Sequence, residues 1–275
     1  MCVPGCMDVV RARITRRALF RQTSLAAAGA MVVTSLPLEA PAAPSSFKSV
    51  LDLTHTLSPD FPTFTGTPGI EMERLADIRK DGYNMFGWRL VEHSGTHLDA
   101  PIHFSEAGAS VEGIEAATLV APLAVVDVAA KAEQDADYLL SRADLAAWEA
   151  KHGTLPPGCC VAMHSGWGRL ATADPARFIG RDVNGTMHFP GIAPEAAEWL
   201  IKERQAAGLA VDTLSLDNGP SREFKTHQLW LPSGRWGLEN VANLERAPAA
   251  GATLVVGLPK VKGATGAPAR LFAFI

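Results

Sequence analysis

The sequence predicts a layered α+β fold in a single domain. Strand-like segments outnumber the two clear helical segments, and the two kinds do not alternate as they do in a doubly wound sheet. With 47% hydrophobic and 20% charged residues, the 275-residue chain can bury a sizeable core, which excludes a disordered or fibrous protein. The net charge of −4 argues against nucleic acid as a partner, because phosphate binding needs a basic face.

Residues 1–42 have the pattern of an export signal. A basic stretch containing Arg16 and Arg17 precedes an apolar, alanine-rich run over residues 25–38, and an A-x-A cleavage pattern ends at Ala42. The arginine pair is typical of the twin-arginine export route. A membrane anchor is the alternative, although the apolar run is shorter than the ~20 residues that a spanning helix needs.

This signal divides the chain into a cleaved leader, residues 1–42, and one folded domain, residues 43–275. We therefore expect a periplasmic or secreted protein with no stable membrane association after cleavage. Cys159 and Cys160 remain after cleavage, and one adjacent pair cannot form a disulfide framework. We interpret both cysteines as small buried residues at the start of a strand.

The strands are predicted from short segments that are β-branched, aromatic or alternately apolar. In chain order they cover residues 50–53, 71–76, 83–91, 123–128, 160–163, 209–216, 254–258 and 270–275. The run at 123–128 is apolar throughout, so we expect that strand to be covered on both faces.

Two helices are predicted from their end signals. Ser141 can cap a helix that continues to about residue 151, Asp144 suits its first turn, and Gly153 ends it. Pro194 suits the first turn of the second helix, and Gly208 is the expected stop. The segment from Phe224 to Trp230 is predicted to form one or two helical turns.

The most informative segment is residues 92–104, which holds three histidines and one aspartate: His93, His97, Asp99 and His103. On an extended strand, His97 and Asp99 point to the same side because they are two positions apart. The segment is unsuited to a helix, because a glycine and a proline lie within it.

Gly95 and Pro101 shape this segment further. Gly95 allows a turn that brings His93 towards the same point, and Pro101 ends the strand pairing and redirects His103.

Imidazole and carboxylate groups together suit a divalent first-row metal such as zinc or manganese. Two histidines and one carboxylate with open positions also match non-haem iron, so the donor types leave the metal open. A structural zinc site is usually closed by cysteines, and no cysteine lies near in the sequence. An open, catalytic site is therefore favoured over a structural one, and a chance cluster of solvated histidines is the simplest alternative.

The segment from His93 to Phe104 closely resembles the signature H-x-G-T-H-x-D-x-P-x-H-F of the cyclase-like metal-dependent hydrolases. This family includes bacterial kynurenine formamidase and isatin hydrolase. The resemblance covers most of the chain after the leader, including residues 52–57, 214–221, 226–240 and 263–275. Residues 61–66 depart from the Trp-Pro-Gly stretch that formamidases tend to carry there.

The resemblance implies a swivelling β/β/α domain, often assembled as a homodimer or homotetramer, with Zn²⁺ or Mn²⁺, one or two per subunit. It also implies roles for six residues. His103 would be the catalytic histidine or a histidine that supports the ligands, and the others would be metal ligands: His93, His97, Asp99, His227 and Glu239. His227 and Glu239 are distant in sequence and complete the site in the family.

The expected activity is metal-dependent hydrolysis of a C–N amide bond in a small aromatic substrate. The resemblance implies an aryl formamide such as N-formylkynurenine, or alternatively a cyclic amide such as isatin. His103 would move the proton as base and then as acid. Phe64, Trp88 and Trp236 are candidates for the substrate-binding wall. An exported metal-binding or small-molecule-binding protein without turnover and an iron-dependent oxygenase remain as alternatives.

Overall fold

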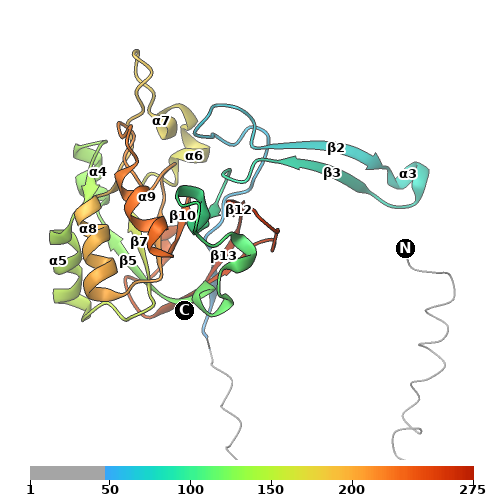
Figure 1. The fold of residues 1–275 in the computed structure, drawn as a ribbon. Helices are drawn as coiled ribbons and strands as arrows, with labels where there is room; N and C mark the ends of the chain where they lie inside the picture. The colour runs from blue at the N-terminus through green and yellow to red at the C-terminus, as the bar shows by residue number, and fades with distance from the viewer. Residues whose placement is uncertain (1–46) are drawn as a thin grey trace, which may run out of the picture. The chain divides into compact units, whose positions relative to one another are not determined.

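A computed structural model describes residues 47–275, so the predicted export signal lies outside the described residues. The centre of this part is a nine-stranded mixed sheet, whose strands stand in the order β1, β13, β11, β5, β7, β9, β10, β4, β12 (Figure 1). In that order they span Val50–Asp52, Arg270–Phe274, Ala252–Gly257, Val120–Asp127, Cys160–His164, Gly208–Val211, Trp236–Glu239, His97–Asp99 and Gly266–Pro268. The run β5, β7, β9, β10 is parallel and the other pairings are antiparallel.

Helices connect and cover these strands. The α-helices are α3 (Ile78–Asp81), α4 (Ala129–Gln134), α5 (Arg142–His152), α6 (Leu170–Ala173), α7 (Pro175–Ile179), α8 (Pro194–Trp199) and α9 (Lys225–Trp230). Short turns are η1 (Pro101–Phe104), η2 (Val111–Gly113), η3 (Ala116–Leu119), η4 (Leu200–Arg204), η5 (Leu231–Ser233) and η6 (Leu244–Arg246). Two further strand pairs lie outside the main sheet: β2 (Ile70–Ala76) with β3 (Met85–Leu90), and β6 (Leu139–Leu140) with β8 (Gly191–Ile192).

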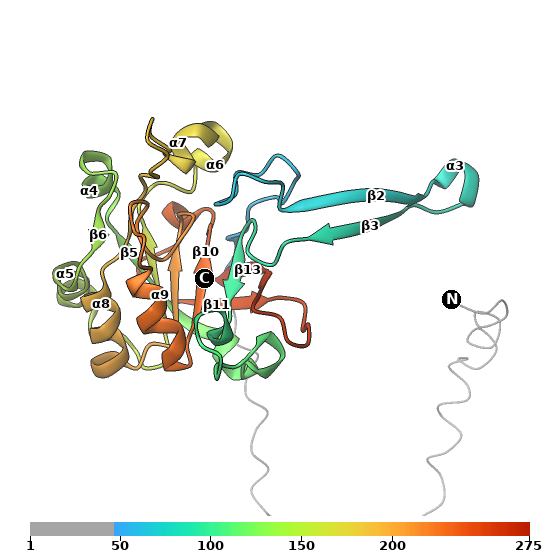
Figure 2. The ribbon, with the colours of Figure 1, turned by 45° about the horizontal axis from the view of Figure 1, so that its top comes forward.

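Two apolar cores form on the two sides of the central strands. In β5, Leu123 and Val125 belong to the core enclosed by the curled sheet, while Ala124 and Val126 belong to the core that includes residues of α5, α8 and α9. Figure 2 shows these three helices along one side of the sheet. Alternate side chains of a strand point to opposite faces, so this strand is buried on both sides, as the apolar run predicted. The predicted α+β class and single layered domain are confirmed.

The first predicted helix is confirmed with its end signals. The Ser141 hydroxyl accepts a hydrogen bond from the Asp144 backbone N–H, and the Asp144 carboxylate accepts one from the Ser141 backbone N–H. This reciprocal capping box stabilises the first turn of α5. Gly153 ends the helix with a positive φ.

The second predicted helix begins at Pro194, but the prediction that Gly208 stops it is wrong. After α8 the chain makes a π-helical turn, and the left-handed Gln205 ends it. Gly208 is instead the first residue of β9, where the Trp236 ring leaves no room for a Cβ.

The strand predicted over residues 209–216 is correct only up to Val211. Beyond it the Asp212 carboxylate accepts hydrogen bonds from the backbone N–H groups of Ser165 and Trp167, and the chain leaves the sheet. The Leu216 N–H donates to the Glu239 carboxylate at 2.9 Å. These side-chain acceptors replace the ladder partners that a longer strand would have used.

The hairpin of β2 and β3 projects away from the sheet and its helices (Figures 1 and 2). Its two strands pair with each other and with no third strand of the described chain. None of the helices formed by residues 47–275 combines the length and apolarity required to span a membrane.

Candidate metal centre

Within the predicted histidine segment, His97–Asp99 form the short strand β4 between β10 and β12, His93 precedes the strand and His103 lies in η1. In the antiparallel pairing with β10, His97 stands opposite Glu239, although the two residues are 142 positions apart in the chain. Asp99 lies on the same side as His97, with its Oδ1 3.4 Å from His97 Nε2, as the spacing of two predicted. The register of one strand pair therefore brings two carboxylates and one imidazole together.

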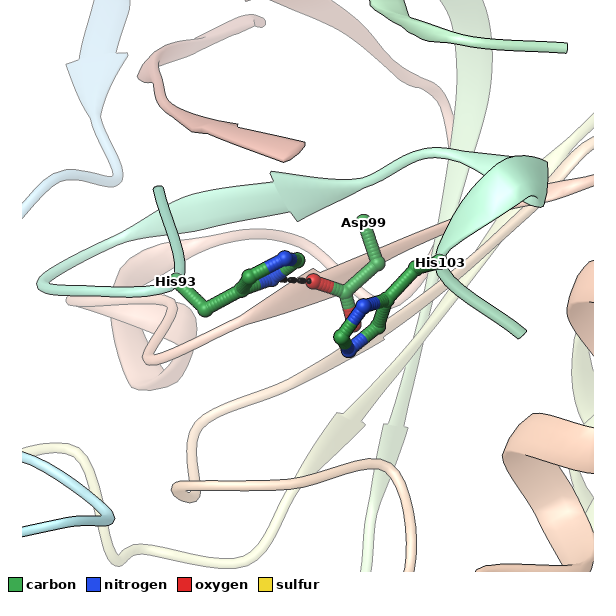
Figure 3. A group of neighbouring side chains, drawn as sticks. All are labelled: His93, Asp99 and His103. Atoms are coloured by element: carbon green, nitrogen blue, oxygen red, sulfur yellow. Dashed lines mark hydrogen bonds and ion pairs between the residues drawn. The ribbon is translucent and has the colours of Figure 1, made fainter. Parts of the chain in front are cut away.

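Two glycines make room for His93. Gly95 has φ +62°, a left-handed turn that allows the chain before β4 to fold back. A Cβ on Gly266 would lie 2.6 Å from His93 Cε1, so the imidazole packs directly on that backbone. In Figure 3 the His93 ring faces Asp99, and the His103 ring lies beside it; the His93 and His103 ring centroids are 3.9 Å apart.

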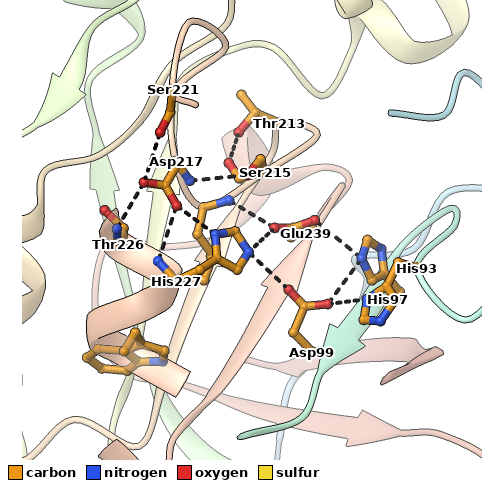
Figure 4. A network of polar contacts seen from close by, with 12 residues as sticks. His93, His97, Asp99, Thr213, Ser215, Asp217, Ser221, Thr226, His227 and Glu239 are labelled. Atoms are coloured by element: carbon orange, nitrogen blue, oxygen red, sulfur yellow. Dashed lines mark hydrogen bonds and ion pairs between the residues drawn. The ribbon is translucent and has the colours of Figure 1, made fainter. Parts of the chain in front are cut away.

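His97, Asp99, His227 and Glu239 form a compact buried group (Figure 4). His97 Nε2 lies 3.3 Å from Glu239 Oε2. His227 Nε2 lies 3.1 Å from Glu239 Oε1 and 3.4 Å from Asp99 Oδ2. The segments that carry the distant His227 and Glu239 thus converge with β4, as the sequence comparison of residues 226–240 implied.

The outer nitrogens of His97 and His227 fix which ring atom faces the carboxylates. His97 Nδ1 donates to the Gly95 carbonyl at 2.9 Å, and His227 Nδ1 donates to the Asp217 carboxylate at 2.6 Å. Nε2 is therefore the nitrogen that each ring presents to the centre. A partner on the second nitrogen that fixes the tautomer is typical of metal-binding histidines.

The donor set fits a divalent cation. His97 Nε2 and Asp99 Oδ2 are buried atoms without a hydrogen-bond partner in the described part of the chain. Burying such polar atoms destabilises the fold unless another group binds them. His97, Asp99 and Glu239 offer ligand atoms within 4.8 Å of one another, as do His93, Asp99 and His103. The two groups share Asp99, so the residues present would hold one cation or two.

His93 differs from the other two imidazoles. Its Nδ1 donates to Asp99 Oδ1 at 2.6 Å, and its Nε2 lies 2.9 Å from the Thr265 hydroxyl. Thr265 in turn donates to the Glu92 carboxylate. For His93 to bind a cation through Nδ1, the hydrogen bond to Asp99 has to give way.

Burial and charge determine how the centre titrates. Burial raises the pKa of the Asp99 carboxyl, but the three histidines around it, His93, His97 and His227, bring it well below its usual value. Burial lowers the pKa of His97, but contacts with Asp99 and Glu239 raise it to about 10. The pKa of His227 is raised in the same way by the carboxylates around it. In the metal-free centre the His97 imidazole is therefore charged near neutral pH, and a divalent cation that binds Nε2 has to displace a proton from it.

His103 behaves differently, because it lies at the edge of the group. Burial lowers the pKa of His103 below its ordinary value, and the effects of neighbouring charges partly cancel. Its ring is therefore neutral at pH 7 and free to accept a proton.

A cavity of about 370 Å³ opens onto this centre and is bordered by His93, His97, His103, His227 and Glu239. Phe64 lines it, as predicted, together with Phe104 and Phe224, which the sequence analysis did not select. The Phe224 ring centroid lies 6.2 Å from that of Phe64 and 6.0 Å from that of Phe104. The three rings form one aromatic wall.

The other two predicted wall residues do not line this cavity. Trp236 is 2% exposed and packs in the sheet core, with its indole N–H donating to the Thr118 hydroxyl. Trp88 is 68% exposed on the projecting hairpin. The residue type alone therefore did not show whether an aromatic ring lies in the core, on the surface or in the wall of the cavity.

Asp217 and Asn240 belong to the site but were not selected from the sequence. Asp217 holds His227, and its signal was its place in the family-like segment 214–221. Asn240 follows Glu239, lines the cavity and donates to the Gly95 carbonyl at 2.8 Å.

Comparison with known proteins shows which family the chain belongs to. The Cyclase family model matches residues 51–218. An isatin hydrolase of Roseibium aggregatum is 32% identical over 244 residues, which cover 82% of this chain and 91% of that protein. The chain therefore belongs to the cyclase family of metal-dependent hydrolases, and the predicted family is confirmed.

Within the family, the likeness to isatin hydrolases extends over the whole described domain. The structure of isatin hydrolase A from Labrenzia aggregata bound to benzyl benzoate gives a TM-score of 0.77 at 32% identity, covering 82% of this chain and 93% of that one. An isatin hydrolase bound to the product analogue thioisatinate gives 0.77 at 30% identity, covering 82% and 92%. A kynurenine formamidase of Salinibacter ruber is 30% identical over 86 residues, which cover 30% of this chain and 41% of that protein.

Proposed function

We propose that the protein hydrolyses the C–N bond of a small aromatic cyclic amide, the reaction class of isatin ring opening, with Zn²⁺ or Mn²⁺ in the described centre. The observation that carries the proposal is a buried group of imidazoles and carboxylates with unpartnered ligand atoms, which faces an aromatic-walled cavity. The similarity to isatin hydrolases over 82% of the chain supports the cyclic amide.

The residues that would hold the cation are His97, Asp99, His227 and Glu239, with His93 as a further ligand once it releases Asp99. A divalent cation held there would lower the pKa of a bound water towards ~7 and would polarise a carbonyl group. Asp99 and Glu239 offset its charge, and their burial beside the imidazoles holds the ligand geometry.

His103 is the group placed to move the proton. It borders the cavity and is neutral at pH 7, because burial lowers its pKa. It accepts a proton from the attacking water and then donates it to the nitrogen that leaves the carbonyl carbon. The same nitrogen remains attached to the product when the substrate is a ring.

The aromatic wall provides the binding surface for the substrate. A cavity of about 370 Å³ is of the size that small-molecule sites have, and its rings Phe64, Phe104 and Phe224 suit a flat apolar molecule. They orient an aromatic ring and exclude bulk water from the bond that is cut.

An aryl formamide such as N-formylkynurenine is the second candidate, as first expected from the signature. The local similarity to a kynurenine formamidase favours it. Its aromatic ring would use the same wall, and His103 would protonate the same kind of leaving nitrogen.

The test is a metal analysis of the purified protein, followed by turnover of isatin, other lactams and imides, and N-formylkynurenine. We expect a divalent metal in the protein and fastest turnover of a cyclic amide. Faster turnover of the formamide would move the assignment to the second candidate. A metal-loaded protein that turns over none of these compounds would instead be a binding protein, and the proposal would be wrong.

The role of His103 has its own test. His103→Ala should lower turnover by ~10²–10⁴ while metal content stays unchanged. His152→Ala is the matched control, because His152 lies at the exposed end of α5, outside the residues that line the cavity. Full turnover in His103→Ala would show that another group moves the proton.

A further inference from the structure

Two residues outside the cation-binding group hold the His93 ring from behind. On the side away from Asp99, His93 Nε2 lies 2.9 Å from the Thr265 hydroxyl oxygen. The same hydroxyl donates to the Glu92 carboxylate, and the Thr265 backbone N–H donates to that carboxylate at 3.2 Å. A continuous chain of hydrogen bonds thus runs from Glu92 through Thr265 and His93 to Asp99, and Figure 3 shows its Asp99 end.

The sheet sets the position of Thr265, although this residue follows His93 by 172 positions in the chain. Thr265 directly precedes β12, which pairs with β4, and the Thr265 carbonyl accepts from the Ala100 backbone N–H at 2.9 Å. A Cβ on Gly266 would lie 2.6 Å from His93 Cε1, so the backbone of β12 also limits how the ring can turn. The hydroxyl is therefore held against the ring by strand pairing.

The directions of these hydrogen bonds follow from the groups involved. A hydroxyl has one hydrogen to donate, and an ionised carboxylate only accepts. Glu92 therefore takes the hydrogen of the Thr265 hydroxyl, and the hydroxyl has only lone pairs left for His93. In this arrangement His93 Nε2 carries a hydrogen and donates it to Thr265 Oγ1.

The bond to Thr265 decides which ring nitrogen is free for a cation. His93 Nδ1 faces Asp99, and it can bind a cation only in the ring form whose hydrogen lies on Nε2. Asp99 by itself favours the opposite form, because its carboxylate accepts the Nδ1 hydrogen at 2.6 Å. A hydroxyl that accepts from Nε2 favours the form in which Nδ1 is free.

We infer that Glu92 and Thr265 are positioning residues that make Nδ1 the cation-binding atom of His93. Glu92 orients the hydroxyl, the hydroxyl retains the hydrogen on Nε2, and Nδ1 keeps its lone pair for the centre. The inference rests on the metal centre of the proposed function. It distinguishes His93 from His97 and His227, which present Nε2 to the centre.

The same contacts extend to the histidine that moves the proton. The His93 and His103 rings are stacked, with centroids 3.9 Å apart and planes inclined by 23°. Thr265 thereby also fixes the surface against which the His103 ring lies. Neither Glu92 nor Thr265 is among the residues that border the cavity, so both act through His93.

A competition titration of Zn²⁺ against a chromogenic chelator tests the inference. Thr265→Val replaces the hydroxyl by a methyl group and should weaken Zn²⁺ binding ~10–100-fold, the usual cost of losing the partner behind a metal-binding histidine. Thr265→Ser keeps the hydroxyl and should bind Zn²⁺ as the unmodified chain does. Glu92→Leu should also weaken binding, because the freed hydroxyl can then donate to Nε2 and leave the hydrogen on Nδ1.

Thr118→Val is the matched control. Thr118 Oγ1 accepts from the Trp236 indole N–H at 3.3 Å and donates to the Glu115 carbonyl at 2.8 Å, so it joins a ring nitrogen to an oxygen as Thr265 does. It does not border the cavity or contact the cation-binding group. Its loss should lower the free energy of unfolding and leave the Zn²⁺ affinity unchanged.

Nitrogen-15 NMR of the unmodified, zinc-loaded protein gives a second readout that needs no variant to fold. The His93 ring should show a hydrogen on Nε2 and none on Nδ1. A His93 ring with its hydrogen on Nδ1 and Nε2 bound to zinc would overturn the inference.

The titration separates failure of the inference from failure of the proposed function. Unchanged Zn²⁺ affinity in Thr265→Val or Glu92→Leu, or equal losses in Thr265→Val and Thr265→Ser, overturns the inference and leaves the proposed function standing. An unmodified protein that binds no divalent cation overturns both.

Discussion

Replacing Asp217 by asparagine removes a negative charge directly behind His227. The Asp217 carboxylate accepts hydrogen bonds from His227 Nδ1 at 2.6 Å, from the His227 backbone N–H at 3.1 Å and from the Thr226 backbone N–H at 2.9 Å. An asparagine of the same shape keeps one acceptor oxygen and gains two donors. The two His227 donors share Oδ2 and the Thr226 N–H uses Oδ1, so at least one of these donors loses its acceptor in either orientation of the amide. In both orientations the negative charge that fixes the proton on His227 Nδ1 is lost, and the His227 ring is held less firmly.

The expected loss of metal affinity follows from the role of a hydrogen-bond partner behind a metal-binding histidine. Loss of the group behind a metal-binding histidine typically costs ~10–100-fold in metal affinity. This corresponds to about 1.4 to 2.7 kcal/mol of binding free energy. We expect the upper part of that range for Asp217→Asn, because the carboxylate is 4% exposed and solvent offers little replacement. The unpaired buried donor should also lower the free energy of unfolding of the metal-free protein by ~1–3 kcal/mol.

The assay is a competition titration of Zn²⁺ between the protein and a chromogenic chelator, paired with urea unfolding of the metal-free protein. Asp174→Asn is the control, because Asp174 caps α7 outside the metal centre and asparagine caps a helix equally well. Wild-type zinc affinity in Asp217→Asn, with only the unfolding free energy lowered, would refute the reasoning. Asp217 would then stabilise its loop without positioning the ligand.

Three more predictions follow from other residues. Because the pKa of His97 is raised to about 10 in the metal-free centre, cation binding at pH 7 should release protons, and the cation affinity should fall by up to ~10-fold per unit of falling pH for each proton released. Calorimetry in buffers of different ionisation enthalpy measures the number of protons released. Binding without proton release contradicts the prediction. Because burial raises the pKa of the Cys159 thiol to about 11, the folded chain without residues 1–42 should not react with a thiol reagent at pH 8 until it is unfolded. Replacing Arg16 and Arg17 by lysines should retain the protein in the cytoplasm, and unchanged secretion in a fractionation experiment would count against twin-arginine export.

The local part of the metal centre could be predicted from the sequence because it depends on short-range geometry. A spacing of two on a strand puts His97 and Asp99 on one side, and Gly95 supplies a turn that only a residue tolerant of positive φ makes easily. The buried strand β5 was predictable for a similar reason, since an apolar run reports burial on both faces.

The binding wall could not be predicted in this way. Phe64, Trp88 and Trp236 are all large aromatic residues, yet Phe64 lines the cavity, Trp88 is exposed on the hairpin of β2 and β3, and Trp236 packs in the sheet core. The type of a residue does not determine whether its side chain faces the cavity, the core or the solvent. That depends on strand order and on loop paths, which are long-range properties.

The sequence by itself determined the α+β class, the imidazole and carboxylate chemistry and the family, because these depend on residue types and their spacing along one segment. Only the tertiary structure decided that Glu239 stands opposite His97, that Asp217 holds His227, and that the hairpin of β2 and β3 projects from the sheet. The physical reason is that strand register and loop paths set these features, and the register of β4 with β10 joins residues 142 positions apart. No local pattern in the chain encodes those contacts.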